Sequence, residues 1–210
     1  QLDEFETDDI KALTNAQISK MSTSQIAGLS DTQLQAFTTA QIPALTSSQI
    51  SNLAPAQLAA FTTDQLKALT ATQIKALTGD QIDAIGTTDF ALLTSTQIAA
   101  LTTSQLDTFD AGQIAGLETS QIKGLTVAQI KSLDATQIAA IETEDLELFT
   151  AAQIAAFTTD QVPVLSAAQI DALSTTQIRA LTTAQIGALT DAQLDEFETD
   201  DIKALTNAQI

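Results

Sequence analysis

The chain repeats one eight-residue phrase from end to end, and this repeat limits the possible folds more than any other feature. Each octad begins with a large apolar residue, from Phe5 to Leu205, and carries a second apolar residue at position six, from Ile10 to Ile210. The 26 octads follow one another without insertion or deletion. Position five is Gln in 22 octads and Asp in four, and position two is Thr, Ser or Asp in 20. A strict short period is typical of solenoids, in which each unit packs on its neighbours.

A longer repeat overlies the octads. Residues 1–18, QLDEFETDDIKALTNAQI, recur letter for letter as residues 193–210, an offset of 192 residues or 24 octads. The octads between them vary, so an identical 18-residue stretch indicates the copying of a long block. We therefore expect residues 1–210 to form a single continuous octapeptide-repeat solenoid. We also expect it to be a 192-residue block within a longer array, cut from a larger polypeptide.

Each octad contains the signals that start a helix. Thr-x-x-Gln is a capping box, in which the hydroxyl at position two accepts a hydrogen bond from the N–H of position five. The Gln side chain reaches back to the N–H of position two. The apolar residues at positions one and six then flank the helix start as a hydrophobic staple. Because about twenty such matches lie in phase, the pattern predicts one helix start in nearly every octad.

If every octad starts a helix, every octad must also end one. We expect helices of about five to seven residues, since the next start follows eight residues later. Pro55 at position three would be the first helical residue, where its missing N–H is not needed. Pro43 and Pro163 at position seven would break a long helix but are tolerated near the end of a short one.

Two other architectures fit the octad less well. In one continuous helix, eight residues at about 100° leave a drift of about 80° per octad, so the apolar stripe would never form one face. In a strand, positions one and six would face opposite sides, and Ala and Gln are poor strand residues. The octad therefore favours an all-α solenoid, a superhelix of very short helices with one per octad.

The expected solenoid has positions one and six pointing inward throughout, every Phe included, because isolated short helices are unstable and must pack on neighbouring octads. Gln at position five is expected to be structural rather than a ligand-binding ladder. Phe37, Phe61, Ile85 and Phe109 lie 24 residues apart, which hints at three octads per turn. We expect about three to four octads in each turn.

The four octads with Asp at position five share a second difference. They lack Thr, Ser or Asp at position two and have Thr at position three. This correlation predicts that the cap shifts onto that threonine. The aspartates would then lie in the first helical turn, where the helix dipole favours an anion. The threonines are Thr7, Thr87, Thr143 and Thr199, and the aspartates are Asp9, Asp89, Asp145 and Asp201.

The sequence offers little material for catalysis, and we expect no enzyme. The chain has no His and no Cys, so the usual bases and thiolate nucleophiles are missing. Carboxylates are scattered over positions expected to face water. The acidic clusters 4–9 and 142–145 lack the spacing of a calcium loop, and weak divalent association is the most they suggest. We assign no catalytic, cofactor-binding or metal-binding residues, and we expect no cofactor.

The net charge of −18 bears on the choice of partners. Such an acidic chain is repelled by nucleic acid and by anionic membranes, so neither is expected as a partner. No stretch reaches the ~18 consecutive apolar residues of a membrane span. The expected partner is the chain itself, through head-to-tail assembly or continuation of the same chain, with other surface components as a further option.

The stretch ALTTAQIGALTDAQL at 180–194 resembles the LTxxQIxAL arrays of very large bacterial secreted or surface proteins, which are often adhesin-like. This resemblance covers the whole chain and implies an extracellular or cell-surface location. Together with the repeat, it favours a non-enzymatic structural protein that forms an elongated rod, stalk or filament. The alternative is a binding solenoid of an adhesin that presents a face to a protein or glycan. A Thr array that binds ice is a minor alternative.

Overall fold

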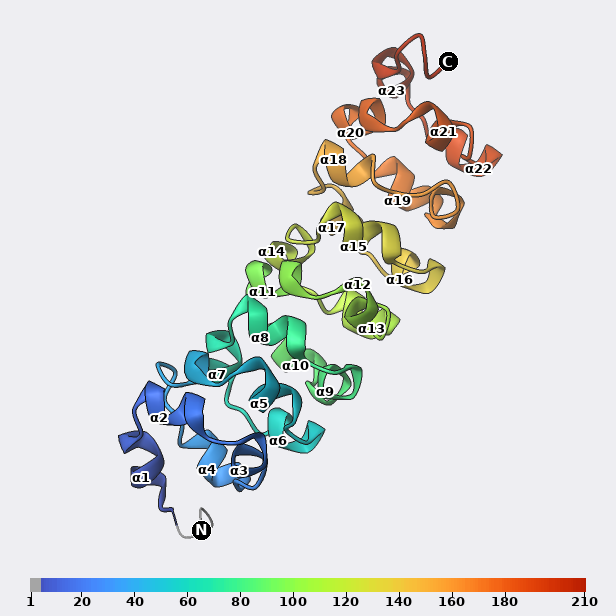
Figure 1. Cartoon of the computed structure of the whole chain (residues 1–210). Helices are drawn as coiled ribbons and strands as arrows, with labels where there is room; N and C mark the ends of the chain where they lie inside the picture. Colours follow the sequence, from blue (N-terminus) through green and yellow to red (C-terminus); the bar gives the residue numbers. More distant parts are fainter. Residues whose placement is uncertain (1–4) are drawn as a thin grey trace. The chain divides into compact units, whose positions relative to one another are not determined.

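Short helices make up the regular structure of residues 5–210, the part of the chain that the computed structural model describes (Figure 1). The octad predicts this, because a cap at position two allows a helix only until the next octad begins. Within the described residues there is no strand, and no helix exceeds six residues. The first half has α1 (Thr7–Ala12), α2 (Asn15–Lys20), α3 (Thr23–Ala27), α4 (Asp31–Gln35), η1 (Ile42–Ala44), α5 (Ser47–Ser51), α6 (Pro55–Ala59), α7 (Thr63–Ala68), α8 (Ala71–Ala76), α9 (Gly79–Ala84), α10 (Thr87–Phe90), α11 (Ser95–Ala100) and α12 (Thr103–Leu106).

The second half continues in the same way. It has α13 (Ala111–Ala115), α14 (Thr119–Ile122), α15 (Val127–Ser132), α16 (Ala135–Ala139), α17 (Thr143–Leu146), α18 (Ala151–Ile154), η2 (Val162–Val164), α19 (Ala167–Asp171), α20 (Thr175–Ala180), α21 (Thr183–Ile186), α22 (Asp191–Leu194) and α23 (Thr199–Ala204). Each of the first 25 octads therefore holds one helix. The all-α class and the one-helix-per-octad architecture are confirmed.

In many octads the backbone turns in two consecutive extended residues. Position one then ends the preceding helix, as Leu69 does with φ −61° and ψ 131°. In other octads the helix ends one or two residues earlier, as at Gly28. Position two caps the next helix, as Thr70 does with φ −75° and ψ 158°. No described residue has a positive φ, so the chain changes direction without the left-handed glycine that ends many helices.

Proline has the effects expected from its position. Pro55 is the first residue of α6. Pro43 and Pro163 lie inside the two 3-10 helices, η1 and η2, which take the place of α-helices in their octads. A proline at position seven has no N–H to donate to the preceding turn. The short 3-10 helix, whose hydrogen bonds join residues three apart, forms without that donor. These octads keep their place in the array.

The chain divides into two compact units, residues 1–108 and residues 109–210. Within each unit the helices in closest contact belong to octads three apart. Examples are α6 with α9 and α5 with α8 in the first unit, and α20 with α23 and α13 with α16 in the second. A helix therefore packs on the coil before it and on the coil after it, as expected for about three to four octads per turn. That residues 1–210 form one continuous solenoid stays a prediction.

Positions one and six form the core of both units. Every position-six residue from Ile10 to Ile178 has at most 2% of its surface exposed. Position one is buried from Leu29 to Leu189, and Phe61 and Phe109 are among these residues. The predicted inward register is confirmed over this range, and Phe90, which occupies position six, is buried with it.

The prediction is wrong at the two ends, where the two apolar positions behave differently. At the first end Phe5, Leu13 and Met21 at position one are half-buried, whereas position six is covered. At the second end the position-six residues become exposed, as Leu194, Ile202 and Ile210 show, and Phe197 and Leu205 at position one are half-buried. Position six is therefore covered by the following coil, whereas full burial of position one needs the coils on both sides. The predicted set of inward positions is fully buried only where both neighbouring coils are present.

Burial gives a direct prediction of stability. Ile98→Ala should lower the free energy of local unfolding by about 2–5 kcal/mol, because it leaves a cavity between coils. Ile202→Ala should cost less than about 1 kcal/mol, because this side chain is half exposed. Thr103→Ala serves as an exposed control. Native-state hydrogen exchange of the surrounding amides measures each value, and equal costs for the two isoleucines would contradict the assignment.

Candidate functional site

The feature that recurs in every part of the described chain is the glutamine at position five. Its side-chain oxygen accepts a hydrogen bond from the cap residue of its own helix, as Gln65 Oε1 does from the Thr62 N–H at 2.9 Å. The Thr62 hydroxyl in turn accepts from the Gln65 N–H at 3.3 Å. The predicted capping box is confirmed here and in the other Gln octads with Thr or Ser at position two for which these bonds are resolved. Gln57 accepts from the Ala54 N–H even though Ala54 has no hydroxyl.

The same side chain also bonds to the preceding coil. Gln65 Nε2 donates to the carbonyls of Leu34 at 2.9 Å and Phe37 at 2.8 Å, 31 and 28 residues earlier. These carbonyls belong to position six and the following position one, where an earlier helix ends. The last carbonyls of a helix have no partner within that helix. One glutamine therefore satisfies the start of its own helix and the end of a helix one coil back.

This inter-coil bond recurs along both units and forms what we call the glutamine ladder. The ladder bonds join carbonyls 28 and 31 residues earlier in both compact units, and the 3-10 octads keep them. Glutamines that donate to both carbonyls include Gln41, Gln49, Gln65, Gln73, Gln81, Gln97, Gln105, Gln161, Gln169, Gln177, Gln185, Gln193 and Gln209.

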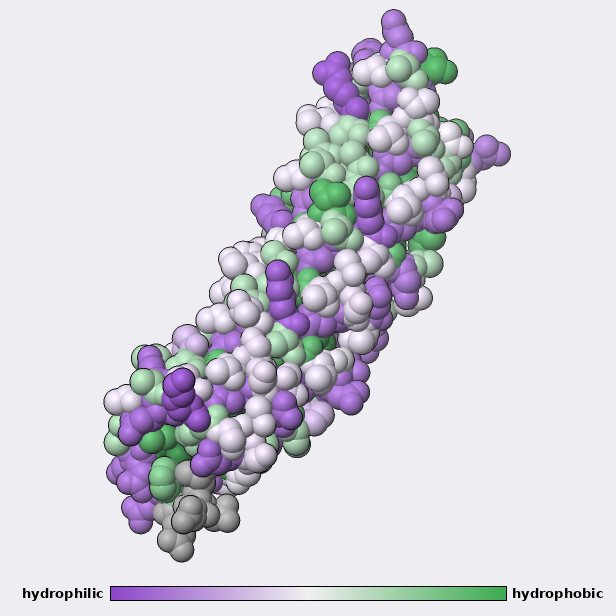
Figure 2. Space-filling view, viewed as in Figure 1, coloured by the Kyte–Doolittle hydropathy of each residue, from purple (hydrophilic) through white to green (hydrophobic). Residues whose placement is uncertain are grey.

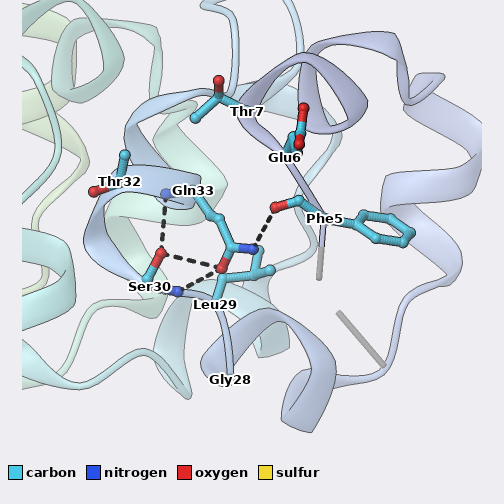
Figure 3. A pocket seen from close by; sticks show the side chains of 8 residues that line it. All are labelled: Phe5, Glu6, Thr7, Gly28, Leu29, Ser30, Thr32 and Gln33. Carbon is cyan, nitrogen blue, oxygen red and sulfur yellow. Dashed lines mark hydrogen bonds between the residues drawn. The ribbon is translucent and has the colours of Figure 1, made fainter. Parts of the chain in front are cut away.

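Figure 3 shows the ladder in a surface crevice near the first end of the chain. Gln33 Oε1 accepts from the Ser30 N–H at 2.9 Å and from its hydroxyl at 3.1 Å. Gln33 Nε2 donates to the Phe5 carbonyl at 2.8 Å across the crevice. The main polar side chain of the crevice thus holds two coils together, and this is a structural use of the site.

Two further crevices lie between helices three octads apart. One, between α20 and α23, is lined by Arg179, Asp200 and Lys203 together with threonines and an alanine. Lys203 is paired there with Asp200 at 2.9 Å, and both side chains are exposed, so the pair contributes little to stability. The other crevice, between α13 and α16, is lined by four alanines and Thr136. Small residues let the helices approach each other closely at this point.

The acidic stretches do not assemble a metal centre in the described residues. Glu4, in the cluster 4–9, lies outside the described range. Among the residues that are described, no group of three or more carboxylates is placed to hold a metal ion. That the chain has no catalytic, cofactor-binding or metal-binding residue stays a prediction.

The predicted shift of the helix cap onto Thr7, Thr87, Thr143 and Thr199 is wrong. Each of these threonines is the first residue of its helix, and position two remains the cap: Glu6, Gly86, Glu142 and Glu198. The reason is that the apolar positions fix the phase, and Asp at position five can still reach back. Asp9 accepts from the Glu6 N–H at 3.0 Å, and Asp201 accepts from the Glu198 N–H at 3.1 Å. The aspartates do lie in the first helical turn, as expected.

Asp145 differs from the other three because it is buried at a ladder position. An ionised carboxylate cannot donate a hydrogen bond to the preceding coil, as glutamine does there. Burial raises the pKa of Asp145, the Thr119 side chain opposes this, and the negative charges of Glu144 and Glu118 add to the increase. The sequence pattern identified this octad as different but gave no sign that its carboxyl would be buried.

These contacts define the class of the protein, an α-solenoid built from repeated capped helices. The chain belongs to the ALTTAQ repeat family, whose model matches residues 2–39, 50–87, 82–119, 138–175 and 168–197. A search of curated proteins found no match. The predicted tandem-repeat family is confirmed, and a chain made of helical repeats fits a non-enzymatic role.

The ladder predicts unequal effects for two glutamines with the same local cap. Gln97→Ala should lower the free energy of local unfolding by about 2–4 kcal/mol, since it removes the cap partner and the bonds to Leu66 and Leu69. Gln17→Ala should cost only about 0.5–2 kcal/mol, the range for a cap, because Gln17 is exposed. Native-state hydrogen exchange of the two helices measures the difference. Equal losses would mean that the inter-coil bonds contribute nothing.

The buried Asp145 predicts that the free energy of unfolding depends on pH. Because its pKa is raised in the folded chain, folding favours the protonated form. Its contribution to stability is therefore full below the ordinary Asp value and is lost as the pH rises through the raised value. Asp145→Gln should remove this loss of stability at rising pH. It should also increase the unfolding free energy at pH 7 by about 1–2 kcal/mol, because a glutamine side chain can donate a hydrogen bond to the preceding coil. Urea unfolding across pH 3–8 tests this, with the exposed Asp160→Asn as the charge control. A fall that persists in Asp145→Gln would assign it to another group.

Proposed function

We propose that the chain is a non-enzymatic structural element that forms an elongated rod, stalk or filament segment at a bacterial cell surface. The observation that carries this proposal is that the contacts between helices join residues a short distance apart in the sequence. Closely packed helices are three octads apart, and the ladder bonds span 28–31 residues in both units. When each coil contacts only the coils beside it, adding octads adds length rather than bulk.

The surface supports a structural role over ligand binding. On the face shown in Figure 2, strongly hydrophobic residues are few and scattered among polar ones. In the described part of the chain, the large apolar residues exposed away from the second end are Leu92, Val127 and Leu148, which lie far apart in the sequence. Among the described residues, every Phe is at least partly buried. A ligand-binding face usually gathers exposed aromatic residues or a fixed pattern of charge.

Charge and the resemblance to large bacterial surface proteins support the proposed location. The net charge of −18 keeps neighbouring copies apart and favours solubility. It also opposes nucleic acid and anionic membranes as partners. No described helix has the length and apolar character needed to cross a bilayer. The resemblance supports a proposed location outside the cell, with other surface components as neighbours.

Small-angle scattering tests the elongated form. A compact domain of 210 residues would have a radius of gyration of about 17 Å. We expect a clearly larger value for this chain, and a maximum dimension that doubles in a chain carrying two blocks in phase. A compact particle for either chain would contradict the proposal.

The cellular location and the role need a separate experiment. Antibodies against the repeat should label intact bacteria that produce the natural protein. Deletion of whole octads from it should shorten the surface layer seen by electron microscopy, without loss of attachment to a protein or glycan surface. Loss of attachment with unchanged layer thickness would instead support the binding role of an adhesin.

A further inference from the structure

The two ends of the chain provide a comparison in which the sequence is constant and the surroundings differ. Residues 1–18 and 193–210 are identical. Ile10 is fully buried, whereas its counterpart Ile202 is 50% exposed. Ile18 is also fully buried, whereas its counterpart Ile210 is 85% exposed. The local sequence cannot explain this difference, so it must come from what packs on each copy.

Residues 29–44 cover the first copy. Helix α4 packs on α1, and η1 packs on α2. Gln33 donates to the Phe5 carbonyl at 2.8 Å, and Gln41 donates to the carbonyls of Ile10 at 3.0 Å and Leu13 at 2.7 Å. Residues 29–44 therefore bring both the apolar cover and the hydrogen-bond donors.

The second copy presents the same groups without that cover. We call the surface formed by Leu194, Phe197, Ile202, Leu205 and Ile210 the end face. Leu194, Ile202 and Ile210 are exposed, and Phe197 and Leu205 are half-buried. Phe197, Ile202 and Leu205 correspond to Phe5, Ile10 and Leu13, whose carbonyls accept from Gln33 and Gln41. The end face thus offers the acceptors and the apolar side chains of a coil whose partner is defined elsewhere in the same chain.

The opposite end of the chain presents the complementary surface, which carries glutamine donors. Gln17 is exposed, whereas its counterpart Gln209 is buried and donates to the carbonyl of Leu181 at 2.6 Å. Each coil therefore has a face with glutamine donors and a different face with carbonyl acceptors and position-six side chains. Contact between two such unlike faces is head-to-tail and can propagate.

We propose that the end face binds a second copy of residues 29–44, in the register in which those residues pack on residues 5–18. This inference rests on the proposed structural role and names the partner of its open end. The second copy continues in phase, with its residue 19 following Ile210. A separate folded chain would have to give up its own contacts between residues 5–18 and 29–44 to make the same ones, and would gain little.

Thiol labelling tests the proposal, because the chain contains no cysteine. Ile10→Cys and Ile202→Cys place one thiol in the same local sequence at either end. In the 210-residue chain, iodoacetamide should label Ile202→Cys at least about 100-fold faster than Ile10→Cys, since burial requires opening before reaction. When a second copy of residues 19–68 follows Ile210, labelling of Ile202→Cys should slow to the rate of Ile10→Cys. The pair Ile18→Cys and Ile210→Cys repeats the test should either first variant fail to fold.

A matched extension identifies the contacts responsible. In this second extended chain the appended copy carries Leu34→Asp, Ile42→Asp, Gln33→Ala and Gln41→Ala. Iodoacetamide should then still label Ile202→Cys rapidly. If the unaltered extension leaves Ile202→Cys fast while Ile10→Cys is slow, or if the altered extension protects it equally, the proposal is wrong. Scattering of the unextended chain is independent of this result. If scattering shows an elongated chain but Ile202→Cys is still labelled rapidly in the extended chain, the proposed partner of the end face is wrong and the proposed structural role stands.

Discussion

A helix of six residues or fewer leaves nearly all of its backbone hydrogen-bonding groups without partners, and the whole structure depends on how these groups are satisfied. The first four N–H groups and the last four carbonyls of any helix lack partners within it. In this chain those two sets account for almost the entire helix. Such helices do not form alone in water. They persist here because Gln at position five accepts from one helix start and donates to another helix end.

This double use of one side chain joins local structure to the superhelix. The oxygen of Gln65 sets where its own helix begins, and the nitrogen sets which residues of the preceding coil lie beside it. Moving a cap by one residue would therefore also break the bonds between coils. This coupling is consistent with Gln41 and Gln161 keeping their inter-coil bonds in octads that proline converts to 3-10 helices. The octads with Asp cannot donate across coils, and they keep their cap at position two because the apolar positions fix their phase, although Thr7 and Thr143 lie next to it.

The parts of the fold that follow from short-range geometry could be predicted from the sequence. The capping box, the inward apolar positions and the place of Pro55 depend on residues within one octad. The donor role of Gln97 could not be predicted in the same way, because its acceptors lie 28 and 31 residues away and the octad alone does not fix the length of a turn. The 24-residue spacing of Phe37, Phe61, Ile85 and Phe109 did point to octads three apart. The burial of Asp145 depends on neighbouring coils in the same way, so its raised pKa had no local signal.

The ladder also determines how an array of this kind can change in length. A ladder bond joins position five to positions six and one of an earlier coil, and these positions recur in every octad. Loss or gain of eight residues exchanges one set of partners for an equivalent set. Loss of any other number places polar side chains in the core and leaves amides and carbonyls unmatched through every later turn. Variation during evolution is thereby restricted to whole octads, so the protein can be lengthened or shortened in fixed steps while single-residue slips are removed by selection.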